Sequence, residues 1–294
     1  MAISDFKMYL PARINEAIER IREDELQEIR IMAEKNCALF INGKIIDTNV
    51  FISKGEFLKI VEGMSRGSLY AMQHSLSNGF FTIAGGHRVG VCGRVRAEDG
   101  KITHMSDISS LCIRVSREIK GVSDIIMPYI KNEEKIYNTL LISPPGAGKT
   151  TILRDIARNI GNTKKVCIVD ERSEIASCRK GVAQNDIGKF TSVLDGAPKA
   201  EGMRILLRTM APDVIITDET GSESEEAAIE SIINCGVKII TTAHGYSEKD
   251  VLKKKHLGTL LENGVFERII VLSSRKGPGT VEKIIKDGQV ISYA

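Results

Sequence analysis

The sequence lacks the features that mark metal-binding, disulfide-rich and membrane-spanning proteins. Its six cysteines show no C-x-x-C pair and no cysteine and histidine spacing, so we expect them to be reduced residues of the core. No apolar run approaches the roughly 18 residues that cross a bilayer, and the first residues lack the basic and then apolar pattern of a signal peptide. We therefore expect a cytosolic protein.

A large excess of one charge is also missing. The formal net charge is +3 although 27% of the residues are charged, and the longest run of like charge is the three lysines 253–255. Basic residues are not interleaved with aromatic ones, as they are in many nucleic-acid grooves. These properties disfavour a dedicated nucleic-acid-binding protein. The length of 294 residues instead indicates a soluble globular protein with room for two domains.

A glycine-rich loop at residues 143–150, Ser-Pro-Pro-Gly-Ala-Gly-Lys-Thr, lies between an apolar run and an amphipathic run. This order predicts a strand, a phosphate-binding loop and a helix whose positive N-terminus points at phosphate. Ser143 replaces the usual first glycine, which is tolerable at negative φ. The alternative is a glycine-rich turn with a chance lysine. The expected nucleotide contacts are Pro145, Gly146, Ala147, Gly148, Lys149, Thr150 and Thr151, with the Thr150 hydroxyl as a ligand of Mg²⁺.

Apolar runs that follow this loop alternate with helical patterns, which is typical of a parallel sheet buried on both faces. The expected strands are 140–142, 166–169, 214–216, 237–240 and 269–272. The carboxyl ends of such strands meet at the edge where α/β proteins bind ligands. Residues that directly follow these strands are therefore candidates for the chemistry of the site.

Two of these strands end in adjacent carboxylates, Asp170 with Glu171 and Asp218 with Glu219. Such pairs suit Mg²⁺-assisted hydrolysis of a phosphoanhydride, because one carboxylate holds the metal's water shell and a neighbour orients or deprotonates the attacking water. We predict Asp218 and Glu219 as metal ligands and all four as catalytic candidates, without deciding which one is the base. The alternative is that either pair belongs to an ordinary acidic loop. His244 follows a third strand and is either a γ-phosphate sensor or a structural histidine.

The part before residue 130 is expected to be a smaller α+β domain. The pair Asn42-Gly43 predicts a hairpin turn, Ser53 and Glu56 form a capping box, and helices are expected over 13–22 and 69–76. A glycine-interrupted antiparallel meander follows over residues 80–105. The charged segment up to residue 138 reads as a connection, so we divide the chain into domains 1–130 and 131–294.

Five arginines of the meander and the segment after it are candidates for phosphate contacts, because guanidinium groups suit bidentate binding of phosphate. Three of them, at even spacing, would share one strand face unless Gly90 or Gly93 introduces a bulge. The alternative is an ordinary solvated strand face. The five are Arg88, Arg94, Arg96, Arg114 and Arg117.

In combination, these motifs resemble those of the secretion-ATPase superfamily, the motors of type II and type IV secretion and pilus assembly. The resemblance lies in the phosphate loop, in residues 170–174 as an Asp-box-like segment, in the run 206–213 that leads to Glu219, and in His244 at the place of a His box. Residues 85–90 (Gly-Gly-His-Arg-Val-Gly) and 218–221 (Asp-Glu-Thr-Gly) are most similar to members that act in sporulation.

The resemblance implies a C-terminal RecA-like P-loop domain with a mainly parallel sheet, ATP and Mg²⁺ as cofactors, and a homo-oligomeric, hexameric ring. It also implies that arginines such as Arg88, Arg94 and Arg117 approach the phosphates from the N-terminal domain or a neighbouring subunit. The expected partner is an inner-membrane channel protein of a sporulation complex, which would hold the chain at the mother-cell side of the membrane, with no direct nucleic acid. The alternatives are a nucleic-acid-dependent translocase or RNA-binding ATPase, and a non-hydrolysing scaffold.

Overall fold

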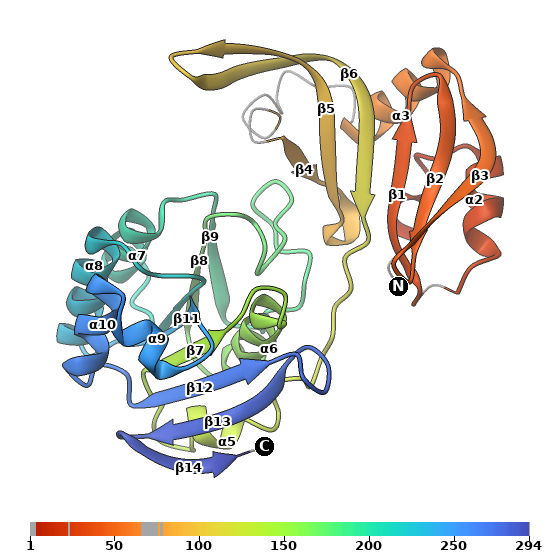
Figure 1. Cartoon of the computed structure of the whole chain (residues 1–294). Helices are drawn as coiled ribbons and strands as arrows, with labels where there is room; N and C mark the ends of the chain where they lie inside the picture. Colours follow the sequence, from red (N-terminus) through yellow and green to blue (C-terminus); the bar gives the residue numbers. More distant parts are fainter. Residues whose placement is uncertain (1–3, 23, 66–75, 77–78, 294) are drawn as a thin grey trace. The chain divides into compact units, whose positions relative to one another are not determined.

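The computed structural model describes residues 4–22, 24–65, 76 and 79–293, and it divides the chain into two compact units (Figure 1). The first unit comprises residues 1–117 and the second residues 118–294. The sequence analysis placed this boundary near residue 130. Ile126, Met127 and Ile130 are buried in a core of the second unit, so the segment just before residue 130 folds with that unit.

The first unit contains a six-stranded antiparallel sheet in the order β3-β2-β1-β6-β5-β4. Its helices are α1 (Ser4–Lys7), α2 (Ala12–Glu19) and α3 (Lys54–Ser65), with a short 3₁₀ turn η2 (Ala84–Gly86). Its strands are β1 (Leu26–Met32), β2 (Lys35–Ile41), β3 (Lys44–Ile52), β4 (Phe80–Thr82), β5 (Arg88–Glu98) and β6 (Lys101–Arg114). A single apolar core, with Phe6 and Phe57 fully buried in it, holds the unit together.

Local signals in the first unit are confirmed. Asn42 and Gly43 have φ of 48° and 78° and form the turn between β2 and β3. The Ser53 backbone N–H donates to Glu56 at 3.1 Å and the Glu56 N–H donates to Ser53 Oγ at 3.4 Å, which is the expected capping box before α3. The register of β5 and β6 shifts between Cys92 and Arg94, at Gly93, which is one of the two glycines where the sequence analysis considered a bulge. The helix expected over 69–76 lies, apart from residue 76, outside the described residues.

The second unit is a three-layer α/β arrangement around an eight-stranded sheet. The sheet order is β14-β13-β12-β7-β11-β10-β8-β9. The strands are β7 (Thr139–Ser143), β8 (Val166–Asp170), β9 (Thr191–Asp195), β10 (Val214–Thr217), β11 (Lys238–His244), β12 (Arg268–Ser273), β13 (Thr280–Lys286) and β14 (Gln289–Tyr293). The helices are α5 (Met127–Ile130), α6 (Lys149–Gly161), α7 (Lys199–Thr209), α8 (Glu223–Asn234), α9 (Glu248–Leu252) and α10 (Lys255–Glu262).

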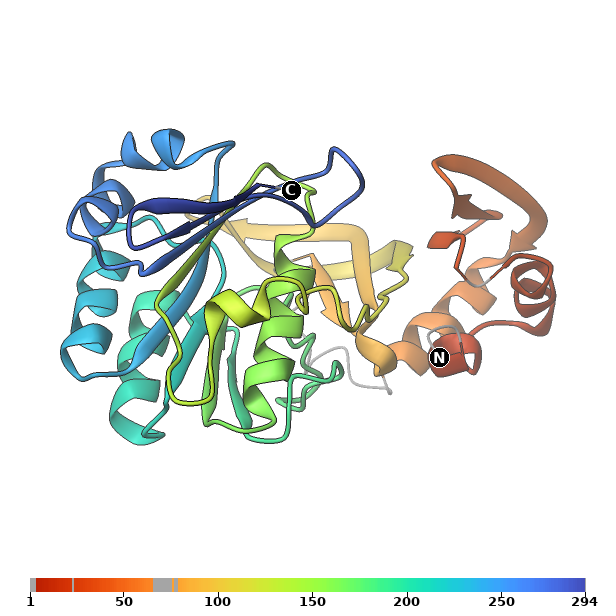
Figure 2. The same ribbon diagram turned by 90° about the horizontal axis from the view of Figure 1, so that it is seen from below.

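The five strands expected in this unit are all present, and they are parallel to one another. β9 extends the parallel part at one edge, whereas β13 and β14 add an antiparallel edge that the sequence analysis did not predict. The sheet is therefore mixed. Successive strand residues alternate between two cores, as Leu141 and Leu140 do, because helices α5 and α6 cover one face and α7 to α10 the other (Figures 1 and 2).

All six cysteines are free, as expected, but Cys92 and Cys235 are exposed and do not belong to a core. Within the described part of the chain, no helix is long and apolar enough to cross a membrane.

Candidate active site

The glycine-rich loop connects β7 to α6, as the sequence predicts. Gly146 and Gly148 adopt φ of 74° and 84°, the left-handed region that favours glycine, whereas Ser143 keeps a negative φ. These turns and the following helix N-terminus form the kind of concavity that binds phosphate. Lys149, the first residue of α6, is almost fully buried at the base of this loop.

The loop between β12 and β13 braces the phosphate loop, a contact that the sequence analysis missed. The Gly279 N–H donates to the Ala147 carbonyl at 2.9 Å, and Pro278 lies against Gly148. This bond turns the Ala147 carbonyl toward the protein and fixes the peptide before Gly148. The sequence signal was the Gly-Pro-Gly at residues 277–279, which marks a turn without saying what the turn touches.

Lys149, His244 and Glu219 form one hydrogen-bonded line at the carboxyl ends of the parallel strands. Lys149 Nζ lies 3.0 Å from His244 Nδ1, and His244 Nε2 lies 2.7 Å from Glu219 Oε1. An ammonium can only donate, so Nδ1 accepts and the ring proton of a neutral His244 is on Nε2, where it donates to the carboxylate. Burial lowers the pKa of Lys149, and the nearby carboxylate of Glu219 acts in the opposite direction.

The backbone of Glu219 is held in an unusual conformation. Its φ is 33°, in the left-handed region, which costs a non-glycine residue about 1–3 kcal/mol. Its N–H donates to Thr242 Oγ1 at 2.9 Å, and its carbonyl accepts from Lys199 Nζ at 2.8 Å. Such strain persists only where the surroundings determine the conformation, and it is common at functional sites.

Lys199 is a site residue that sequence reasoning missed. It begins α7, it is only 8% exposed, and its Nζ lies 3.6 Å from both Asp218 Oδ1 and Glu171 Oε2. Both distances are those of ion pairs and are too long for hydrogen bonds. No motif surrounds this lysine in the sequence, so the only signal was its place after the segment 191–195, which was not recognised as a strand.

Asp218 and Thr150 fit a magnesium site. Asp218 is 5% exposed, burial raises its pKa although Lys199 acts in the opposite direction, and its Oδ1 has no hydrogen-bond partner. The Thr150 hydroxyl makes no hydrogen bond to the described residues, and none joins it to Asp218. The described residues contain no cluster of three or more histidine, cysteine or acidic side chains that could hold a metal. Mg²⁺ commonly takes one or two protein ligands together with phosphate oxygens and water, and this set suits that mode.

Asp170, predicted as a catalytic candidate, is bonded to the backbone of its own loop. It is fully buried, and its two carboxylate oxygens accept the backbone N–H groups of residues 174, 175 and 176. Burial raises the pKa of Asp170 to about 6, although these three donors act in the opposite direction. Arg154 of α6 donates to the carbonyls of residues 174 and 175. Asp170 therefore anchors this loop, whereas Glu171 is 40% exposed and stays near Lys199.

The five candidate arginines of the first unit do not all meet in one cluster, although Arg88 and Arg114 lie opposite each other in the ladder of β5 and β6. Arg88 stacks on the Phe80 ring at 3.5 Å, and the Arg117 guanidinium donates to the Leu26 carbonyl at 2.6 Å. Arg96 pairs with Glu98 at 3.3 Å and Arg114 with Glu28 at 3.5 Å. Arg94 is exposed, and its side chain makes no hydrogen bond or ion pair with the described residues.

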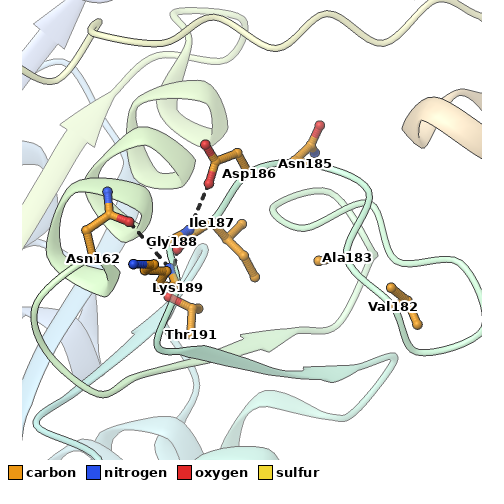
Figure 3. Close-up of a pocket in the computed structure, with 9 residues that line it drawn as sticks. All are labelled: Asn162, Val182, Ala183, Asn185, Asp186, Ile187, Gly188, Lys189 and Thr191. Carbon is orange, nitrogen blue, oxygen red and sulfur yellow. Dashed lines mark hydrogen bonds between the residues drawn. The ribbon is translucent and has the colours of Figure 1, made fainter.

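A separate hollow of about 700 Å³ lies at the other end of α6 (Figure 3). It is lined by Asn162, which follows the last residue of α6, and by residues between 182 and 191, which lead into β9. The phosphate loop is at the first residue of α6, so this hollow is on the opposite edge of the sheet. None of the predicted site residues lines it.

The fold of the chain is similar to that of a solved molecular motor. The solved structure of the pilus retraction motor PilT with bound ADP superimposes with a TM-score of 0.58 at 16% identity, over 89% of this chain and 78% of that one. This likeness concerns the fold.

The family follows from the sequence comparison. The model of the family "Sporulation stage III, protein AA" matches residues 5–291, and the chain belongs to that family. The stage III sporulation protein AA of Bacillus subtilis is 39% identical over 293 residues, which cover 96% of this chain and 95% of the relative.

A shorter match is to a protein with a different name. The transcription termination factor Rho of Mycobacterium tuberculosis is 41% identical over 86 residues, which are 27% of this chain and 14% of Rho.

Proposed function

We propose that the protein is an Mg²⁺-dependent ATPase of the secretion-motor type, with a RecA-like nucleotide-binding core in its second unit. The observation that carries the proposal is the line Lys149, His244 and Glu219, because it joins the phosphate loop after β7, through His244 of β11, to the carboxylate that follows β10. The membership in a sporulation family and the fold shared with PilT support it.

Each residue of the site has a role in this proposal. The loop N–H groups and Lys149 bind the phosphates and offset their charge, while Thr150 and Asp218 hold the metal. Bound Mg²⁺ supplies positive charge to the phosphate oxygens. Glu219 orients and deprotonates the attacking water, and His244 keeps its carboxylate in place. Lys149 bonds to His244 in this structure, so it must exchange that partner for phosphate when ATP binds.

The cellular role is also a proposal. We infer a homo-oligomeric, hexameric ring in the cytoplasm, held at the membrane by an inner-membrane channel protein of a sporulation complex and powering or assembling that channel. The support is the sporulation family together with the fold of a pilus motor. Cross-linking in sporulating cells tests the partner.

The enzymatic part is tested by steady-state hydrolysis of ATP by the purified chain and by Lys149→Ala. We expect turnover in the parent that requires Mg²⁺ and is abolished by chelation, and no turnover in K149A, because the loop loses the cation nearest the phosphates. The control is Lys253→Ala, which removes an exposed lysine of the same unit. A parent without hydrolysis, or K149A at the parent rate, would refute the assignment.

The match to Rho favours a second candidate, a nucleic-acid-dependent ATPase. Its test is the same assay with single-stranded RNA or DNA added. Stimulation of tenfold or more, together with nucleic acid recovered in pull-downs, would support it over the secretion-type motor. The nearly balanced charge leads us to expect no stimulation. A non-hydrolysing scaffold is disfavoured because Asp218 and Glu219 are both present and Glu219 is held at its N–H and its carbonyl.

A further inference from the structure

We propose that Lys199 is a positioning residue, one that holds the Glu219 peptide and thereby fixes where the catalytic carboxylate points. The inference rests on the proposed function and deepens it. Its first basis is a direct bond: Lys199 Nζ donates to the Glu219 carbonyl at 2.8 Å. The same ammonium lies 3.6 Å from Asp218 Oδ1 and from Glu171 Oε2, so it contacts both acidic strand ends at once.

The surroundings of Lys199 argue against an ordinary structural lysine. It occupies the first position of α7, where the helix dipole disfavours a positive charge, and its side chain is only 8% exposed. A buried ammonium is retained where it is paired and hydrogen-bonded. Among the described residues its one hydrogen-bond acceptor is the carbonyl of Glu219, and its charge faces the carboxylates that follow β8 and β10, which are adjacent in the sheet.

The neighbours of Glu219 explain what the bond does. Glu219 is held at its N–H by Thr242, at its carboxylate by His244 and at its carbonyl by Lys199. Thr242 and His244 both belong to β11, whereas Lys199 approaches from α7. Without Lys199 the strained Glu219 peptide is held from one side only, and it can relax to negative φ. That rotation would carry the carboxylate away from its place beside His244.

The test compares Lys199→Met, which keeps length and removes the charge, with Lys199→Arg, which keeps charge and donors. Lys253→Met is the matched control, because it removes one exposed cation of the same unit. Three quantities are measured: kcat and KM for Mg-ATP, affinity for ADP without metal, and hydrogen exchange of the peptide spanning residues 217–221. The exchange measurement does not depend on hydrolysis.

For K199M we expect kcat to fall by about 10–100-fold, the usual loss when a residue that orients a catalytic group is removed. KM and the metal-free ADP affinity should change little, because the phosphate loop is intact. Exchange at residues 217–221 should accelerate because the Glu219 peptide is freed. K199R should recover slow exchange and part of kcat, and K253M should match the parent.

The inference is overturned if K199M matches K253M in kcat and in exchange. It is also overturned if K199M loses metal-free ADP binding as much as turnover, since that loss would reflect a general structural role. If K199M does not fold, Thr242→Val replaces it, with Thr242→Ser as its control, because it removes the acceptor of the Glu219 N–H and so loosens the same residue at its preceding peptide. If Thr242→Val and Thr242→Ser have the same turnover and the same hydrogen exchange, the inference is likewise refuted. A parent that binds ADP without hydrolysing ATP refutes the proposed function instead and leaves the exchange comparison decisive for Lys199.

Discussion

The charged residues that the sequence singled out converge in the second unit and disperse in the first. In the second unit, Lys149, His244 and Glu219 are joined by contacts of 3.0 and 2.7 Å, and Lys199, which the sequence analysis missed, bonds to the Glu219 carbonyl at 2.8 Å. In the first unit, the candidate arginines contact separate local partners, such as the Phe80 ring and the Leu26 carbonyl.

The two sheets explain this difference. Parallel strands bring all their carboxyl ends to one edge, so residues far apart in the sequence meet there. In the β5 and β6 hairpin, residues follow one another along extended strands, which rise about 3.3 Å per residue, and Arg88 and Arg94 are therefore roughly 20 Å apart. We infer that the second unit holds a nearly complete site, whereas an arginine of the first unit contributes only where another surface meets it.

The sharpest test of this comparison is Arg94→Ala. Arg94 is the one of the five candidates whose side chain makes no hydrogen bond, ion pair or ring contact with the described residues, so it is best placed to act on another subunit's nucleotide. Arginine fingers are worth about 10³–10⁵ in rate, and we expect a loss of that order with ADP binding retained. Arg96→Ala, in the same strand but paired with Glu98, is the control.

A mixing experiment shows whether the arginine acts between chains. K149A chains keep Arg94 and R94A chains keep the phosphate loop, so a mixture should regain activity if the two sites meet across a subunit boundary. Turnover per chain should also rise with protein concentration as rings form. If R94A and R96A hydrolyse ATP equally well, the alternative interpretation holds, and these arginines belong to an ordinary solvated strand face. The same mixing applied to Arg88→Ala and Arg117→Ala tests the other two candidates.

The second prediction concerns the converging residues. Glu219→Gln keeps the shape of the side chain but cannot accept a proton, so kcat should fall by about 10²–10⁴ while Mg-ATP still binds and is trapped. Single-turnover hydrolysis and nucleotide release measure this. Glu171→Gln, at the more exposed carboxylate, is the control and should lose much less. If E171Q loses more activity than E219Q, the carboxylates of β8 hold the base instead.

The third prediction tests the anchoring role of Asp170 through pH. Its pKa is raised to about 6 in the folded protein from an ordinary value of 3.8, so folding favours the protonated carboxyl. That contribution to stability is complete below about pH 4 and is lost as the pH rises through 6. Asp170→Asn stays neutral, so the melting temperature of the parent minus that of D170N should decrease between about pH 5 and 7.5. The whole shift corresponds to about 3 kcal/mol, of which about 1.4 kcal/mol is lost over this window because one pKa unit of it lies between pH 5 and 6.

Asp155 provides the control of opposite sign. Burial raises its pKa, but hydrogen bonds from Ser123 and Arg158 outweigh burial and lower it below 3.8. The contribution of Asp155 to stability is therefore present above pH 3.8 and is lost only in more acidic solution. The melting temperature of the parent minus that of Asp155→Asn should stay constant between about pH 5 and 7.5, where the corresponding value for D170N decreases. If the melting temperature of the parent minus that of D170N did not change with pH, the three backbone donors would be keeping Asp170 ionised.

The smallest effect compares two glycines of positive φ, one in each unit. Gly43→Ala and Gly279→Ala each place a Cβ at φ of 78° and 87°, which costs about 1–2 kcal/mol of stability. A Cβ at position 43 would meet open space, whereas Gly279 bonds to Ala147 and a Cβ added to it would lie 3.3 Å from Ile152 Cδ1. Only G279A should therefore weaken nucleotide binding, as measured by calorimetry. Equal affinities in the two variants would show that the β12 and β13 loop does not brace the site.

The sequence by itself determined the features whose cause lies within a few residues. The turn at Asn42 and Gly43, the capping box of Ser53 and Glu56, and the strand, loop and helix around Lys149 all depend on local conformational preferences. The alternation of apolar runs with helices also placed Asp218, Glu219 and His244 at strand ends, since burial on both faces of a sheet leaves a readable pattern.

Only the tertiary structure decided which of these residues act together. The bond between Lys149 and His244 spans 95 residues, and the bond from Lys199 to Glu219 joins a helix start to a strand end. Asp170 resembles Asp218 in sequence, yet it is occupied by three backbone N–H groups of its own loop, while an oxygen of Asp218 is left without a partner. Such differences depend on strand order and on the path of each loop, and no local preference encodes either, because the same dipeptide after a strand is compatible with both outcomes.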